Sequence, residues 1–370
     1  MTASFPPATL SPADEVTPMI DRNGVPKLMI RDLWKVYGPG TQRLFSGRTT
    51  PPTEQDLIEH GVFAAVRNAS FDVWPGELIT VMGLSGSGKS TLLRAIGRLI
   101  EPDFGKVMLD NEDLLAASPK RLIDLRRHRM GMVFQNYALL PHRTVLENVA
   151  LPLEVRGEGK GKREERAREM IELVGLKDRI DHFPTQLSGG QQQRVGIARS
   201  LAVDPDVWFL DEPFSALDPL IRNELQGELL RLQGIVRKTI LFVTHDFDEA
   251  VRLANRIVIM EGGRIAQIGT PEDIVLNPMD AYIANFTKHV RRAEVVSVGS
   301  LATLLNGVTG IDTTVPAAAR VIDVADRILA SSGPVGVVGP DGTIIGTVTA
   351  DAVISMLLER PSGAPRSKSA

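Results

Sequence analysis

The sequence contains no cysteine, which excludes disulfide bonds as well as thiolate-based metal and redox sites. It also lacks any apolar run near the roughly 18 residues that a membrane helix needs. Its N-terminus does not show the basic-then-apolar pattern of a signal peptide. A chain without cysteine suits a reducing compartment. We therefore expect a cytoplasmic protein that meets a membrane only through a partner.

Strong charge of either sign is missing as well. The formal net charge is -3 over 370 residues, and the sequence pI is near 6.1. Such a balance argues against a nucleic-acid-binding surface as the main function. Hydrophobic residues make up 43% of the chain, enough for substantial cores. The length fits two or three domains.

One glycine-rich segment, 83–90 (GLSGSGKS), organises the rest of the chain. The apolar run before it, 78–82, is predicted to be a buried strand, and 91–96 is predicted to begin a helix. In that context successive backbone N–H groups curve around phosphate oxygens, and the helix N-terminus adds partial positive charge. A chance glycine turn is the alternative, and the flanking elements disfavour it. The predicted phosphate-binding residues are Gly83, Ser85, Gly86, Ser87, Gly88, Lys89, Ser90 and Thr91.

Two of these residues carry specific chemistry, and two acids further along complement them. Lys89 supplies a full charge for the outer phosphates, and the Ser90 hydroxyl suits Mg²⁺. Asp211 ends a predicted apolar strand, where ligands of open α/β sheets bind, so we expect it to hold Mg²⁺. Glu212 follows at once and is the natural general base for the attacking water. Two solvated turn acids are the competing interpretation.

Two further strand ends carry candidate polar groups. His245 follows the predicted strand 239–244, where a γ-phosphate sensor would act, although a lone histidine there is more often structural. Gln135 ends the predicted strand 132–135 and is expected to contact the metal or the water. A lone glutamine would be uninformative without the other motifs.

A second phosphate-binding element is predicted at 187–191, before another helix. Ser188 can cap that helix, while Gly189 and Gly190 leave backbone N–H groups open to an anion. One nucleotide is already cradled by 83–90. This second element is therefore expected to serve a nucleotide held by another subunit, which predicts a dimer with ATP at its interface. Tyr37 could stack on adenine, or it is a core or surface aromatic residue.

Residue patterns along the chain predict its secondary structure and its division into domains. Alternating strands and helices imply a mainly parallel sheet covered on both faces, after an antiparallel sheet at the start. A surface insertion with one helix, capped by Thr53, is expected within 39–65. A helix is predicted at 293–305. The expected domains are a flexible tail at 1–26, a main α/β domain at 27–285 with a helical part at about 137–200, a small α/β domain at 290–358, and a disordered tail at 359–370.

Six motifs in this order resemble the ATPase subunit of ABC transporters. They are Walker A (83–90, then Thr91), the Q-loop Gln135, the signature 187–191, Walker B Asp211 with the catalytic Glu212, the D-loop 215–218 and the switch His245. The resemblance covers 27 to about 270 and implies a P-loop ABC ATPase fold. It implies a head-to-tail dimer with two interfacial ATP molecules and Mg²⁺. It also places Tyr37 at the adenine-stacking position and adds Gln191 and Asp218 to the nucleotide site.

Within that family the chain is similar to the ATPases of glycine betaine/proline, or quaternary amine, importers. The similarity is carried by the insertion at 41–65 and by the segments 98–102, 138–142 and 214–222. The segment 290–358 resembles a single CBS module, a kind of module that normally works in pairs. This resemblance implies a homodimer on the inner face of the membrane, docked to integral permease subunits. It further implies an indirect link to an extracytoplasmic solute-binding protein, a regulatory nucleotide at the CBS-like domain, and no nucleic acid.

Three alternatives remain open. The chain could serve an importer for another solute. It could be a soluble ABC protein of translation or DNA repair, although those usually carry two cassettes or a long coiled coil, and neither is visible here. It could also be mainly a sensor of ionic strength or of a nucleotide, through 290–358.

Overall fold

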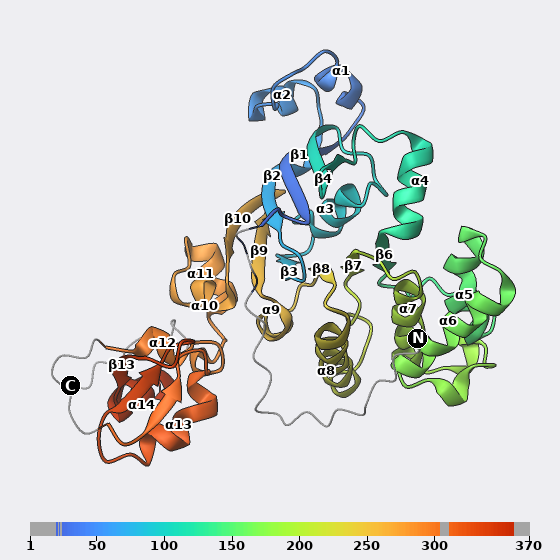
Figure 1. Ribbon diagram of the computed structural model, residues 1–370. Helices are drawn as coiled ribbons and strands as arrows, with labels where there is room; N and C mark the ends of the chain where they lie inside the picture. The colour runs from blue at the N-terminus through green and yellow to red at the C-terminus, as the bar shows by residue number, and fades with distance from the viewer. Residues whose placement is uncertain (1–19, 21, 23, 304–310, 359–370) are drawn as a thin grey trace. The chain divides into compact units, whose positions relative to one another are not determined.

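The computed structural model describes residues 20, 22, 24–303 and 311–358 (Figure 1). The chain forms two compact units, of which one spans Asp21–Thr287 and the other begins at Lys288. The predicted tail at 359–370, and most of the one at 1–26, lie outside the described residues. Among the described residues, no helix combines the length and apolarity that crossing a membrane requires.

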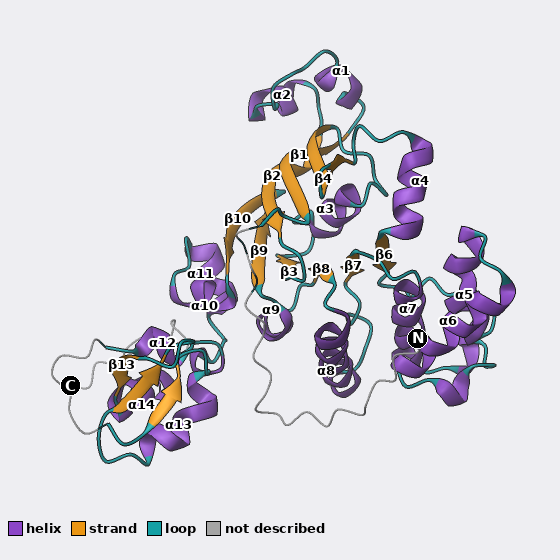
Figure 2. Cartoon of the chain, viewed as in Figure 1, coloured by secondary structure: helices purple, strands orange, loops and turns teal. Residues whose placement is uncertain are grey.

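A six-stranded sheet lies at the centre of the first unit (Figure 2). Its middle strands pair in parallel, and only the edge strand β10 runs antiparallel to its neighbour. Every residue of β3, β7 and β8 is buried, which explains why these strands are nearly continuous apolar runs. In spatial order the strands are β10 (Arg264–Gly269), β9 (Arg256–Glu261), β3 (Leu78–Met82), β8 (Thr239–Val243), β7 (Val207–Asp211) and β6 (Met130–Val133).

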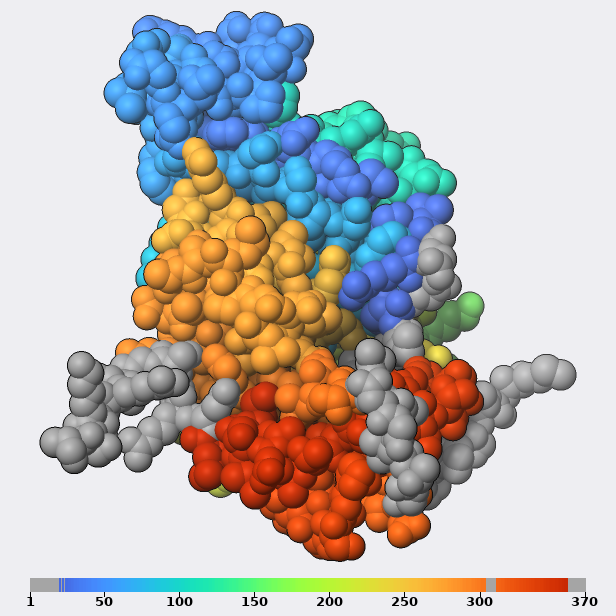
Figure 3. All heavy atoms as spheres, turned by 90° about the vertical axis from the view of Figure 1, so that its left-hand side faces the viewer, coloured from blue at the N-terminus to red at the C-terminus, as the bar shows by residue number. Residues whose placement is uncertain are grey.

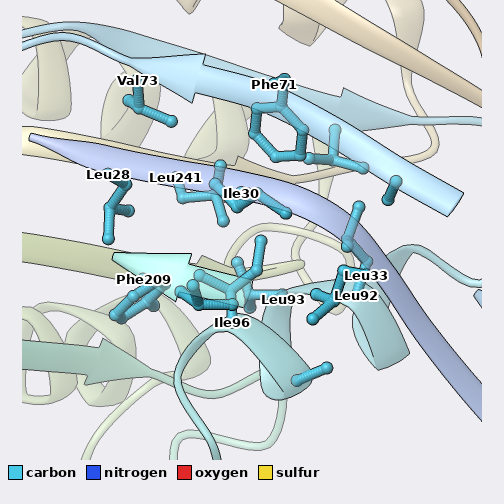
Figure 4. Close-up of a cluster of buried hydrophobic side chains, with 14 of the residues drawn as sticks. Leu28, Ile30, Leu33, Phe71, Val73, Leu92, Leu93, Ile96, Phe209 and Leu241 are labelled. Atoms are coloured by element: carbon cyan, nitrogen blue, oxygen red, sulfur yellow. The ribbon is translucent and has the colours of Figure 1, made fainter. Parts of the chain in front are cut away.

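A second, antiparallel sheet of four strands packs over the helix α3, Lys89–Ile96. Figure 4 shows side chains from this sheet, from α3 and from the central sheet meeting in one core. Burial of each large apolar side chain there stabilises the fold by about 1.5–3 kcal/mol. The helix that follows the glycine-rich loop is therefore held on both sides. The strands in order are β2 (Phe63–Val73), β1 (Leu28–Tyr37), β4 (Phe104–Leu109) and β5 (Glu112–Asp113).

The insertion contains two helices where one was predicted: α1 (Thr41–Phe45) and α2 (Glu54–Glu59). The capping role of Thr53 is confirmed, because its side chain and that of Asp56 form a reciprocal capping box at the start of α2. Helix α1 lacks a side-chain cap, so the sequence gives no start signal for it. Figure 3 shows the insertion as a blue lobe that projects from this unit.

Of the remaining helices of this unit, α4, α7, α9 and α10 contact the central sheet. Helices α5, α6 and α7 pack against one another, and the long helix α8 follows β7 (Figure 1). Their bounds are α4 (Pro119–His128), α5 (Val145–Arg156), α6 (Lys160–Leu173), α7 (Gly189–Ala202), α8 (Pro219–Val236), α9 (Phe247–Leu253), α10 (Pro271–Leu276) and α11 (Ala281–Thr287), with short 3-10 turns at Lys177–Arg179 and Pro184–Gln186.

The second unit has a three-stranded sheet in which β11 pairs in parallel with β12, and β12 pairs antiparallel with β13. Its elements are a 3-10 turn at Arg292–Glu294, α12 (Val298–Leu301), β11 (Thr314–Pro316), α13 (Val321–Leu329), β12 (Val335–Val338), β13 (Ile344–Val348) and α14 (Ala350–Leu358).

The helix predicted at 293–305 is wrong. The described part contains only the 3-10 turn and the four-residue α12, and residues 304–305 lie outside the described residues. Ser297 is extended and bridges to Arg320, while Thr303 bridges to Thr347. Pairing with distant backbone therefore replaces the local helix, and the β-branched residues at 295–296 already weaken helix propensity.

Candidate active site

The glycine-rich loop between β3 and α3 is closely packed on one side and open on another. Gly83, Gly86 and Gly88 have φ of 149°, 80° and 100°. A Cβ on Gly88 would lie 2.0 Å from the carbonyl oxygen of Ala65, and one on Gly83 would lie 2.3 Å from that of Met260. A Cβ on Gly86 would meet no atom within 4 Å. The loop is thus pressed against β2 and β9 and leaves its Gly86 side free.

Lys89 is the charged group of this loop, and its side chain is buried. Its Nζ donates hydrogen bonds to the carbonyl oxygens of Gly83 (2.9 Å) and Leu84 (3.0 Å). Burial lowers the pKa of Lys89, while the nearby carboxylates of Glu212 and Asp211 oppose that shift. The ammonium therefore lies between the loop and the two acids that the sequence singled out.

Strand register explains why these acids lie near the loop. Val81 in β3 is level with Val243 in β8, and Val243 is level with Asp211 in β7. The carboxyl ends of the three neighbouring strands thus meet at one edge of the sheet. Strand β6 ends at Val133, so the predicted strand end at Gln135 is wrong by two residues. Gln135 is exposed in the loop that follows.

Asp211 has one carboxylate oxygen paired and one free. Its Oδ2 accepts hydrogen bonds from Arg94 of α3, with 3.0 Å from Nε and 2.9 Å from Nη2. Its Oδ1 is buried and has no hydrogen-bond partner, and the same is true of the Ser87 hydroxyl. Unpaired buried oxygens of this kind are uncommon in folded proteins. Mg²⁺ is usually bound by one or two carboxylates together with substrate phosphates, so a single free carboxylate oxygen beside the phosphate loop fits this cation.

Glu212 and His245 are brought together beside Asp211. The distance from Glu212 Oε2 to His245 Nδ1 is 3.3 Å. The backbone of Glu212 is left-handed, with φ of 46°, and its N–H donates to the carbonyl oxygen of Val243 at 3.1 Å. A non-glycine residue in this conformation is strained, and such strain clusters at functional sites. The hydroxyl of Ser215 donates to the Glu212 carbonyl oxygen at 3.1 Å and holds this turn.

The second predicted phosphate element lies at the start of α7. Ser188 caps the helix by accepting from the N–H of Gln191, whose side chain accepts from the Ser188 N–H at 3.0 Å. Gly189 and Gly190 occupy the first turn, where N–H groups have no partner within the helix. A Cβ on Gly190 would lie 2.6 Å from Ile221 Cγ2, so only glycine fits beside α8. Across the described ranges, no hydrogen bond or ion pair joins 187–191 to 83–91.

Tyr37 and Asp218, which are both predicted to contact the nucleotide, interact with other residues in this structure. Tyr37 ends β1 and is 44% exposed, with the Lys35 ammonium 5.2 Å from its ring centroid. Asp218 is the N-cap of α8 and accepts a hydrogen bond from the Ile221 N–H at 3.1 Å. Among the described residues of this unit, no hydrogen bond or ring contact joins Tyr37 or Asp218 to the phosphate loop.

Sequence reasoning missed two residues that support the site. Arg94 holds Asp211, but its partner becomes evident only when β7 is placed beside α3. Tyr282 of α11 accepts a hydrogen bond from the Leu84 N–H at 3.3 Å and donates to the Met260 carbonyl oxygen at 3.0 Å. No local pattern announces these contacts: Arg94 and Asp211 are 117 residues apart, Leu84 and Tyr282 are 198 residues apart, and Met260 and Tyr282 lie in different elements, β9 and α11.

The fold and this site define the ATP-binding protein of an ABC transporter. The family model described as "ABC transporter" matches residues 66–215. The chain is similar to the dimeric structure of MJ0796, a bacterial ABC transporter cassette, with a TM-score of 0.56 and 34% identity; the match covers 66% of this chain and 98% of that one. The central sheet, the glycine-rich loop and the helical part therefore belong to a known architecture.

Sequence relatives place the chain more closely. It is 50% identical to the trimethylamine N-oxide transport system ATP-binding protein TmoW of Ruegeria pomeroyi, over 91% of this chain and 98% of that protein. It is 43% identical to the glycine betaine/proline betaine transport system ATP-binding protein ProV of Escherichia coli, over 75% of this chain and 69% of that protein. The chain belongs to the family of ABC transporter ATP-binding proteins, and it is an ATPase.

Proposed function

We propose that this ATPase hydrolyses MgATP at the edge formed by β3, β8 and β7, with Glu212 as the general base. The observation that carries the proposal is the cluster of Lys89, Asp211, Glu212 and His245 at the carboxyl ends of these strands. The γ-phosphate would replace the loop carbonyls as the acceptor for Lys89. Glu212 would take a proton from the attacking water, and His245 would position that water and the phosphate.

The residues that would hold Mg²⁺ are the Ser90 hydroxyl, Asp211 and Gln135. A cation held there would supply positive charge that neutralises the charge developing on the phosphate oxygens. Asp211 fits this role because its Oδ1 is buried without a partner while Arg94 fixes its other oxygen. Gln135 lies in an exposed loop beyond β6 and would complete the set from the neighbouring strand.

The signature element supports a head-to-tail homodimer. The N–H groups of Gly189 and Gly190, together with Ser188, would contact the γ-phosphate held by a second copy, and Gln191 and Asp218 would lie at the same interface. Within the described part of one chain, this element makes no hydrogen bond or ion pair to the phosphate loop. Each nucleotide would therefore be bound by two chains, and closure of the dimer would accompany ATP binding.

The loop after β6 is proposed to transmit closure to membrane permease subunits on the inner face of the membrane. Arg199 of α7 is buried, and it donates hydrogen bonds to the carbonyl oxygens of Ala138 (2.6 Å) and Tyr137 (2.8 Å). Both acceptor residues are left-handed, with φ of 49° and 58°. Arg199 thus links α7, the helix that begins with the signature, to the loop that begins at Gln135. Movement of α7 on ATP binding would move residues 135–141.

The transported solute is proposed to be a small methylated amine delivered by an extracytoplasmic solute-binding protein. The similarity to TmoW extends over 336 residues, more than the whole of the 21–287 unit, and so reaches the second unit. The matches to the glycine betaine proteins are shorter, at 276 and 277 residues. This difference favours trimethylamine N-oxide over glycine betaine.

The unit that begins at Lys288 is proposed to be a single CBS-like regulatory domain. Its element order from β11 to α14 is strand, helix, strand, strand, helix, as expected for such a module. A nucleotide or ionic strength would be sensed there and would adjust transport. The interpretation of the whole chain as a sensor has less support, because the larger unit holds the complete set of ATPase motifs.

Reconstituted transport tests this function. The chain, its permease and its solute-binding protein would be placed in ATP-loaded vesicles, and uptake of trimethylamine N-oxide, glycine betaine and choline would be compared. We expect ATP-dependent uptake of a methylated amine, strongest for trimethylamine N-oxide. Transport of none of these solutes, in vesicles that hydrolyse ATP, would contradict the assignment of the solute.

A further inference from the structure

A pocket at the base of the insertion takes no part in the proposed function. Its volume is about 360 Å³, at the small end of the range for ligand pockets. It shares no residue with the candidate active site. The residues that line it are Trp34, Pro51, Pro52, Thr53, Glu54, Arg67, Asn68, Arg264 and Ile265.

The charges of this pocket do not cancel. Arg67 Nη1 lies 2.5 Å from Glu54 Oε1, and Arg264 Nη2 bonds to the same oxygen. The other lining residues are uncharged, so one carboxylate faces two guanidinium groups and leaves an excess of positive charge. The two guanidinium groups outweigh burial and lower the pKa of Glu54, so this carboxylate stays ionised. Further guanidinium N–H groups remain available to an anion.

Trp34 adds an independent donor. This side chain is only 5% exposed, and its indole Nε1 has no hydrogen-bond partner. A buried N–H without an acceptor is unfavourable, so such groups usually have one. Trp34 lines the pocket, and its Nε1 is itself buried, so a bound oxygen would reach this donor only if the neighbouring side chains shifted slightly.

We propose that this pocket binds a small oxyanion, either a carboxylate or a phosphate group. Arg67 and Arg264 would hold the anion in competition with Glu54, and the Trp34 N–H would donate to one of its oxygens. Planar guanidinium groups suit both oxyanions, since they can donate two parallel hydrogen bonds. A cation is disfavoured by the excess positive charge, and an apolar ligand would leave the guanidinium groups unpaired.

The pocket wall is connected to the phosphate loop by two backbone hydrogen bonds. The Arg67 N–H donates to the Gly263 carbonyl oxygen at 2.7 Å, and the Gly263 N–H donates to the Ser87 carbonyl oxygen at 3.1 Å. Gly263 has φ of 82°, and a Cβ there would lie 2.9 Å from the Ala64 carbonyl oxygen. The hairpin turn is therefore tightly held between pocket and loop. Occupancy of the pocket is expected to change nucleotide affinity, and nucleotide is expected to change anion affinity by the same factor.

The test measures anion binding to the full chain by calorimetry. A non-hydrolysable ATP analogue saturates the phosphate loop and the γ-phosphate position so that neither can bind the probe, and chloride keeps the ionic strength constant. The probes are inorganic phosphate in one arm and acetate in the other. We expect saturable binding at one site, for at least one probe. Phosphate binding alone would identify a phosphate ligand, and acetate binding alone a carboxylate ligand; either result supports the site.

Three variants test the pocket, and they are expected to change its anion affinity in different directions. Glu54→Gln removes the competing carboxylate and should tighten anion binding about tenfold, whereas Arg264→Gln and Trp34→Phe should weaken it about tenfold. Arg121→Gln, which breaks a surface ion pair elsewhere, is the matched control and should leave binding unchanged. Arg264 is well exposed, so its variant retains the fold even if Trp34→Phe does not.

The proposal is overturned if neither anion binds saturably, or if the Glu54→Gln and Arg264→Gln variants bind as the unmodified chain does. Coupling is tested separately, by measuring the affinity for the same ATP analogue with and without saturating anion. An unchanged affinity for the analogue would overturn the link through Gly263.

Discussion

Single residues at the sheet edge carry the chemistry of this ATPase. Glu212 is held in a left-handed conformation by its N–H bond to Val243, and its carboxylate faces His245 at 3.3 Å. The identity of these groups could be predicted from the sequence, because each follows an apolar strand. The left-handed turn at Glu212 could not be predicted, since it depends on how β7 lies beside β8.

Replacing Glu212 with glutamine tests the proposed role of this single residue as the general base. Glu212→Gln preserves the shape of the side chain but removes the base, so steady-state hydrolysis should fall by at least about a hundredfold. ATP binding should persist, because Lys89 and the loop glycines are untouched. The measurement is phosphate release together with nucleotide binding. Exposed Glu224→Gln, on α8, is the control, and retained turnover in the Glu212 variant would refute its role as base.

Among the elements, short buried strands were predicted best and polar or weakly capped segments worst. The bounds of β3 agree with the strand predicted at 78–82, and those of β8 agree to within one residue with the strand predicted at 239–244, because glycine or polar residues delimit each apolar run. The prediction of a helix at 293–305 is wrong, because Ser297 and Thr303 pair with distant backbone. Helix α1 was missed because it has neither a cap nor a long apolar face.

An ion cluster near the start of β6 predicts how stability varies with pH. Arg129 and Lys27 both bond to Asp110, and Arg129 also pairs with Asp206. Burial alone would raise the pKa of Asp110, but hydrogen bonds from Arg129 and Lys27 outweigh it and lower the pKa. This carboxylate therefore contributes stability above its unfolded pKa of about 3.9, and the contribution is lost as pH falls through the lower folded value.

Asp110→Asn should destabilise the chain at pH 7 by about 1 kcal/mol, the size expected for partly exposed pairs. The difference from the unmodified chain should shrink below about pH 4. Asparagine tolerates the left-handed backbone at this position, so strain does not confuse the result. Urea unfolding across this pH range is the measurement, with exposed Asp178→Asn as control. A difference that does not vary with pH would show that packing, rather than charge, is responsible.

At the scale of the whole molecule, the candidate active site and the proposed regulatory domain belong to different compact units. The unit Asp21–Thr287 contains its own core and the full candidate active site. Ending the chain after Thr287 should therefore leave ATP hydrolysis within about twofold of the full chain. Its response to salt or to an added nucleotide should be altered. ATPase rates over a salt series measure both effects, and an unchanged response would make the second unit merely structural.

A dimer is predicted from one sequence because the signature is a second phosphate-binding element without a nucleotide of its own. The pocket at the base of the insertion and the hydrogen bonds from Arg199 to residues 137–138 could not be predicted in the same way. Each of these depends on segments that fold together from distant parts of the sequence.

The central claim is that each ATP is bound by the phosphate loop of one copy and the signature of the other. The most direct measurement mixes two inactive variants, Lys89→Ala and Ser188→Arg, in equal amounts. Half of the dimers should be mixed, and each mixed dimer has one intact site, so the mixture should recover about a quarter of the unmodified ATPase rate. Each variant alone should be inactive. A mixture as inactive as its components, although mixed dimers form, would contradict the shared site.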